Sequence, residues 1–211
     1  MITITRELAT RVRDIVAQGL TSGLGQPEPG KMCVEAAVCF ALGLPHGDDP
    51  GCVSSALRQL KIRLNDAPWS SNAARADGLR RLAVAQLGSA GILDDQAFVA
   101  RVAERTIRIV VPIALRAAAS RNPKHAIALE DAAQRCAREG TRAAAYAAAN
   151  AAAAADAAAA AADAAAAAAA TATAAAATAR DTSLAAYAEW VVEILIDMQA
   201  PGCEFLDLVP R

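Results

Sequence analysis

Residues 143–179 read AAAYAAANAAAAADAAAAAADAAAAAAATATAAAATA, and thirty of these 37 residues are alanine. Alanine has the highest helix propensity of the amino acids. On a helical wheel eight polar residues fall within an arc of about 140°, Thr173 and Arg180 fall outside it, and the other faces are otherwise left to alanine. The pattern predicts a helix with a close-packed underside and one solvated stripe, which contains Arg142, Tyr146, Asn150, Asp156, Asp163, Thr171, Thr178 and Asp181.

The length of this Ala-rich tract constrains the fold. No Gly or Pro interrupts it between Thr141 and Arg180, so we expect one long helix that continues towards Met198. The 40 residues would span about 60 Å, whereas a compact domain of this chain length has a radius of gyration near ~17 Å. We therefore expect a spine of the fold or an assembly surface. The alternative is a codon-driven expansion that packs on nothing and frays.

The rest of the chain also has helical periodicity, and we predict an all-α bundle of about seven or eight helices. Residues 106–111 are β-branched, but a lone strand would have no partner, so we expect a helix that Pro112 kinks. Local signals predict helix starts at Thr5, Asp49, Ser70 or Ser71, Asp94 or Asp95, Asn122 and Thr141, and helix ends at Gly43, Gly88, Gly140 and Pro201.

The domain organisation expected from this pattern has two parts. Residues 1–140 form a helical domain. Residues 141–211 form the long Ala-rich helix and a C-terminal helix, which pack with the first part as one unit.

The composition limits the class of protein. Hydrophobic residues make up 55% and charged residues 20%, which argues against disorder. Asp156 and Asp163 inside the Ala-rich tract are costly in hydrocarbon, so we expect no membrane span. Charges near the N-terminus interrupt any apolar signal region, so we expect a cytoplasmic protein whose five cysteines are reduced thiols. Arginine and alanine codons are GC-rich, which suggests a high-GC bacterium or its phage.

Charge is unevenly distributed along the chain. Residues 58–121 carry eleven basic and five acidic side chains, and residues 181–211 carry one and six. A nucleic-acid surface is one interpretation of the basic segment. No DNA- or RNA-binding motif accompanies it, so we favour charge pairing within the fold or across an oligomer, and nucleic acid is not expected as a partner.

Reactive side chains are densest in residues 30–52, GKMCVEAAVCFALGLPHGDDPGC. Cys33 follows a Gly-containing loop at the start of a helix, where the partial positive charge would lower a thiol pKa. This arrangement resembles the nucleophile site of papain-like and transglutaminase-like enzymes, and it implies Cys33 as nucleophile with His46 and Asp48 as further site residues. His125 is the other histidine that could serve as base. Those families carry their histidine on a strand, which this chain does not offer.

Two other interpretations of the same segment are weighed. Cys33, Cys39, His46 and Cys52 could bind zinc, but zinc sites usually pair ligands across two to four residues, and no such pair exists here. The favoured interpretation is structural, because free cysteine commonly packs as a small hydrophobe. We therefore expect no metal and no cofactor.

These observations lead to a leading function hypothesis. We expect a non-enzymatic cytosolic protein that works by shape, through a protein partner or by self-association. The alternative is a cysteine hydrolase or acyltransferase that uses Cys33.

Overall fold

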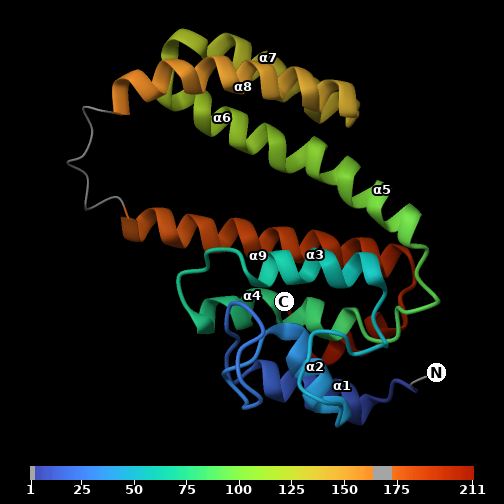
Figure 1. Ribbon diagram of the computed structural model, residues 1–211. Coiled ribbons are helices and arrows are strands. Elements are labelled where there is room, and N and C mark those ends of the chain that lie inside the picture. Colours follow the sequence, from blue (N-terminus) through green and yellow to red (C-terminus); the bar gives the residue numbers. More distant parts are fainter. Residues whose placement is uncertain (1–2, 164–172) are drawn as a thin grey trace. The chain divides into compact units, whose positions relative to one another are not determined.

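The computed structural model describes residues 3–163 and 173–211, and the regular elements in them are all helical (Figure 1). The all-α class predicted from the sequence is confirmed. The described residues form nine α-helices, two short 3-10 helices and one π-helical turn. This number exceeds the seven or eight expected, because a π turn divides the helical segment around Pro112 and the Ala-rich tract is described on both sides of residues 164–172.

Contacts divide the chain into two compact units. Unit 1 is Met1–Phe98 with Ala172–Arg211, and unit 2 is Val99–Thr171. The boundary expected after residue 140 falls inside unit 2, between two helices that pack on each other. That residues 141–211 fold as one unit with the rest stays a prediction.

Unit 1 is organised around one central helix, α4. It packs against α1, α2, α9 and the 3-10 helix η3. Apolar residues cover several faces of α4 towards its C-terminal end, where Leu79, Leu82 and Val84 are buried. The elements of this unit are α1 (Arg6–Val16), α2 (Val34–Leu42), α3 (Ser55–Asn65), α4 (Asn72–Ala85), α9 (Thr173–Asp197) and η3 (Pro201–Leu208).

Most of the helix boundaries follow from local sequence signals. The Thr5 hydroxyl accepts a hydrogen bond from the Leu8 amide, and the Ser71 hydroxyl accepts one from Ala74. Gly43 and Gly140 end α2 and α7 with φ of 71° and 63°, a left-handed conformation that glycine adopts without steric cost. These predicted caps are confirmed.

The cap predicted at Asp49 is wrong. We expected Asp49 and Pro50 to start a helix, but α3 begins five residues later, with Ser54 as its cap. The Asp49 carboxylate instead accepts a hydrogen bond from the Gly51 amide, and Gly51 has φ of 66°. The chain therefore turns at Gly51, and the helix that carries the buried residues Leu57 and Leu64 begins only after this turn.

Pro112 lies in a helical segment, as predicted, and a π-helical turn precedes it. The chain runs from α5 (Asp95–Arg105), which belongs to unit 2 from Val99 on, through η1 (Thr106–Val110) into α6 (Val111–Arg121). The Val111 amide donates to the Thr106 carbonyl, five residues back. This wider turn accommodates the proline ring, which in a regular α-helix would clash with the carbonyl four residues earlier.

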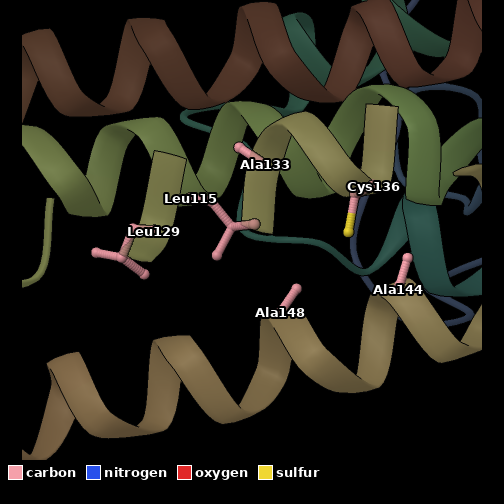
Figure 2. Packing of buried hydrophobic residues seen from close by; sticks show 6 residues of the cluster. All are labelled: Leu115, Leu129, Ala133, Cys136, Ala144 and Ala148. Carbon is pink, nitrogen blue, oxygen red and sulfur yellow. The ribbon is translucent and has the colours of Figure 1, made fainter. Parts of the chain in front are cut away.

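Unit 2 is completed by η2 (Pro123–His125), α7 (Ala126–Glu139) and α8 (Arg142–Asp163). Its buried core is small and half of it is alanine, and Figure 2 shows Ala144 and Ala148 of α8 facing the neighbouring helices. Along the same helix, Arg142, Tyr146 and Asn150 are exposed. The first part of the Ala-rich tract therefore has the predicted wet stripe and packed underside. The core contains Leu115, Leu129, Ala133, Cys136, Ala144 and Ala148.

The rest of the tract is outside this description. The predicted continuity of the helix falls on residues 164–172, which lie outside the described residues. Ala160, Ala167 and Thr171, which also belong to the tract, have no described side-chain environment. In the part of the chain that the structure describes, no helix has the length and hydropathy needed to cross a membrane.

Alanine packing in α8 can be tested with two adjacent substitutions. We expect Ala148→Leu to destabilise unit 2 by about 1–3 kcal/mol, because the larger side chain overpacks the contact with α7. Ala149→Leu, on the exposed side, is the matched control and should cost much less. Both tryptophans lie in unit 1, so unit 2 is followed by hydrogen exchange of the α7 and α8 amides. Equal protection in the two variants would contradict a packed underside.

Candidate functional site

The segment that the sequence singled out, residues 30–52, belongs entirely to unit 1. Cys33 is the N-cap of α2, and its Sγ accepts a hydrogen bond from the Ala36 amide at 3.3 Å. Seven of the nine residues of α2 are buried, as expected for a helix that is apolar nearly all round. The one charged residue among them is Glu35, and its carboxylate has no exposed surface.

A fully buried ion pair forms the centre of the site. Lys61 reaches from α3 so that its Nζ lies 3.2 Å from Oε1 of Glu35, and both side chains are completely enclosed. The atoms are close enough to attract, but neither the ammonium nor the carboxylate has an aligned hydrogen-bond partner among the described residues. Burial raises the pKa of the Glu35 carboxyl and lowers the pKa of the Lys61 amine, and their mutual attraction opposes both shifts.

Three thiols share the electrostatic environment of this pair. Cys33, Cys39 and Cys52 are all buried free thiols. Burial raises the pKa of each, to about 11 for Cys39. We expected the start of α2 to lower the pKa of Cys33, and the shift has the opposite direction because desolvation of the thiolate outweighs the hydrogen bonds from the helix amides and the attraction of Lys61.

Histidine and aspartate of the predicted alternative site lie in the loop after α2. The His46 ring nitrogen Nε2 is 3.2 Å from the Gly25 carbonyl oxygen. Asp48 is exposed, and its Oδ1 lies 3.8 Å from Nη1 of Arg58. His125 belongs to unit 2. No hydrogen bond joins Cys33 to His46, whose ring is directed to a backbone carbonyl instead.

A small pocket connects part of this cluster. It has a volume of about 90 Å³, and Cys33, Glu35 and Asp48 line it together with Asn65 and Asp66. His46 is not among the lining residues. The pocket therefore gathers a thiol and carboxylates from the predicted segment but leaves the histidine outside.

Within the described residues, no group of three or more His, Cys, Asp or Glu side chains is arranged to hold a metal ion. A cation near Cys33 or Cys52 would also be repelled by the Lys61 ammonium, whose charge acts on both thiols. The zinc interpretation therefore gains no support from the geometry.

Sequence reasoning missed the Glu35–Lys61 pair, although a signal was present. Lys61 occupies a position on the apolar stripe of α3, four residues after Leu57 and three before Leu64. Glu35 is the lone charge in an apolar helix. A charge on each of two buried faces predicts that the two are paired, because an isolated buried charge is too costly.

Some of the cations of the basic segment 58–121 are buried in the structure. Lys61, Arg75 and Arg81 are buried, so they are not available to a polyanion. Arg75 and Arg81 hold carbonyl oxygens of Leu20 and Val209. These cations stabilise the interior of unit 1.

Comparisons of the chain with protein-family models, with curated proteins and with solved structures found no match.

The buried pair makes a strong prediction about stability. We expect Lys61→Met to lower the free energy of unfolding of unit 1 by about 3–5 kcal/mol, because Glu35 is left buried without a counter-charge. The doubly substituted protein, Glu35→Met with Lys61→Met, should be within about 1 kcal/mol of the original or more stable. Urea unfolding followed by the fluorescence of Trp69 and Trp190 measures both, since both tryptophans lie in unit 1.

The single variant should also show a distinctive pH dependence. In Lys61→Met the folded-state pKa of Glu35 stays above its unfolded value, so the stabilising proton is bound below the unfolded pKa and lost as the pH rises through the folded pKa. Stability of this variant should therefore fall as the pH is raised, and the double variant should lack this fall. A pH-independent loss in the single variant would contradict the role given to Glu35.

Proposed function

We propose that this protein is a non-enzymatic helical interaction protein that self-associates through the α6–α7 face of unit 2. The observation that carries the proposal is the exposure of two isoleucines, Ile113 at 54% and Ile127 at 80%, on either side of one ion pair. Ile113 lies three residues before Arg116 on α6, and Ile127 lies three residues before Glu130 on α7. Residues at this spacing share a helix face, so the four side chains form one surface.

The small core of unit 2 is a reason to expect that a second molecule covers this surface. Of its six buried core residues, three are alanine and one is cysteine. Such side chains bury little area, and small cores commonly need oligomerisation or another reinforcement. Large apolar side chains that could have enlarged the core face outwards instead.

Charge on the same face favours a second copy of this chain over other proteins as the occupant. Nε of Arg116 lies 3.2 Å and 3.3 Å from the two carboxylate oxygens of Glu130, so both signs of charge sit side by side. A two-fold axis parallel to the helices would place Arg116 of each copy opposite Glu130 of the other, with both isoleucines in the interface. A face with equal and adjacent opposite charges is complementary to itself.

Under this proposal, α8 is the spine of a helical bundle in unit 2. It packs on α6 and α7 through its alanine underside and keeps a polar stripe towards solvent. The alanine-rich helix supports the α6–α7 face from behind and does not itself make the contact between copies.

The mass in solution tests self-association. We expect about twice the chain mass of 21.6 kDa for the original protein. Ile127→Glu and Ile113→Glu should each shift the protein to the single-chain mass, because a buried unpaired carboxylate is costly. Ile92→Glu is the matched control, since Ile92 is similarly exposed in a turn of unit 1. A single-chain mass for the original protein, or an unaltered oligomer in Ile127→Glu, would sink the proposal.

A second candidate function is a cysteine hydrolase or acyltransferase that uses Cys33. One observation favours it, because Cys33 and Asp48 line the same small pocket. Its weakness is the raised thiol pKa and the separation of His46 from the pocket.

Thiol labelling separates the two functions. For an interaction protein, we expect Cys33 to react with iodoacetamide at neutral pH no faster than Cys203. Burial raises the pKa of both thiols, to about 11 for Cys203, but Cys33 is buried whereas Cys203 is half-buried and more accessible to the reagent. The labelling of Cys33 should accelerate as the pH is raised. Mass spectrometry of digested protein gives the rate at each cysteine. Preferential labelling of Cys33 at neutral pH would favour the enzyme, and loss of that labelling in Cys33→Ser would serve as its control.

A further inference from the structure

Unit 1 contains a hollow of about 620 Å³ that neither the proposed function nor the buried pair uses. It lies between the end of α1, the beginning of α4 and the segment Leu208–Pro210. This volume is within the range of about 300–1,000 Å³ that small-molecule sites occupy. Its polar lining consists of Arg13, Gln18, Asn72, Asp77 and Arg80, and the remaining lining is largely small or apolar.

A buried arginine fixes the orientation of Asn72 at this hollow. Nη1 of Arg75 donates to Oδ1 of Asn72 at 2.7 Å, and Arg75 is only 6% exposed. The same guanidinium donates to the carbonyl oxygens of Leu20 and Asn65, at 3.0 Å and 2.7 Å. Because a guanidinium only donates, the amide oxygen of Asn72 must face Arg75. Its NH₂ group has no acceptor among the described residues and is left to donate to a ligand.

Two arginines from different helices supply the charge. Arg13 on α1 donates through Nε and Nη2 to Asp14 at 2.8 Å and 2.6 Å. Arg80 on α4 pairs with Asp77 at 3.4 Å and donates through Nη2 to the Pro210 carbonyl. These contacts hold the two side chains and still leave N–H groups of each guanidinium without a protein acceptor in the described part of the chain. The lining itself contains two cations and one carboxylate, and Asp14, the carboxylate that pairs with Arg13, is not part of the lining.

We propose that this hollow binds a small organic anion whose carboxylate or phosphate group is held by Arg13, Arg80 and the Asn72 amide. Guanidinium groups are suited to both kinds of anion, because their planar N–H groups bond two oxygens at once. The apolar part of the ligand would lie against Ala73, Ala76 and the Leu208–Pro210 wall. This inference is independent of self-association, since every lining residue belongs to unit 1.

Binding is tested with three aromatic probes that differ in their polar group: benzoate, phenyl phosphate and the neutral benzyl alcohol. Each is titrated into the full chain at about 0.15 M ionic strength, where unspecific surface attraction is screened, and amide and Arg Nε–H resonances are followed by NMR. We expect saturable shifts at Arg13, Asn72 and Arg80 with one or both anions and none with benzyl alcohol. Comparing the two anions identifies which group the site prefers.

Three variants test the residues. Arg13→Gln and Arg80→Gln should each weaken binding about tenfold, which corresponds to about 1.4 kcal/mol. Asn72→Asp keeps the oxygen that Arg75 requires but replaces the donor with a negative charge, so it should weaken binding at least as much while leaving the fold unchanged. Arg11→Gln is the matched control, because Arg11 is an exposed arginine of α1 that does not line the hollow.

The outcomes are decisive in both directions. Absence of saturable binding by both anions would overturn the proposal, and so would unaltered binding in a folded Asn72→Asp protein. An equal loss in Arg11→Gln would show that the anions follow net surface charge and not this site.

Discussion

The scarcity of large apolar side chains limits how this protein can build its cores. Much of its apolar content is alanine, whose methyl group contributes little buried area. Aromatic residues make up only 3% of the chain. Unit 1 builds its core by surrounding α4 with four other helical elements and filling the interior with Leu, Val and Trp69. Two glycines also allow neighbouring segments to pack closely. Gly78 leaves room for the Trp69 ring, and Gly202 lies against the backbone of α4.

Unit 2 meets the same constraint less completely. Its helices α6, α7 and α8 enclose a core with two leucines, and the other buried positions are small (Figure 2). Isoleucines that would usually belong inside such a unit remain on its surface. The proposed self-association would compensate for the small core, because a second copy would supply the apolar contact area that the alanines do not.

The interior of unit 1 contains charged side chains as well as apolar ones. Glu35 and Lys61 join α2 to α3 without access to water, and Arg75 joins three separate segments through Leu20, Asn65 and Asn72. Such contacts contribute less to stability than apolar packing would, but they tolerate few alternative arrangements. Burial of the nearby thiols is the largest cause of their raised pKa values, and the two charges of the pair act on Cys33 in opposite directions. The three cysteines of the cluster that looked reactive in the sequence are buried free thiols.

The sequence by itself determined the all-α class, the caps at Thr5, Ser71, Gly43 and Gly140, and the wet stripe at the start of α8, because each depends on residues within about one or two helical turns. Tertiary structure decided what lies far apart in the chain. Ser54 replaced Asp49 as a cap because Gly51 turns the chain first. The pKa of the Cys33 thiol is raised and not lowered, because burial of the thiolate outweighs the helix amides and the attraction of Lys61. The anion pocket likewise needs Arg13, Asn72 and Pro210 side by side. Hydrogen bonding along a helix is local and leaves a pattern in the sequence, whereas desolvation and charge pairing depend on which segments the fold places together.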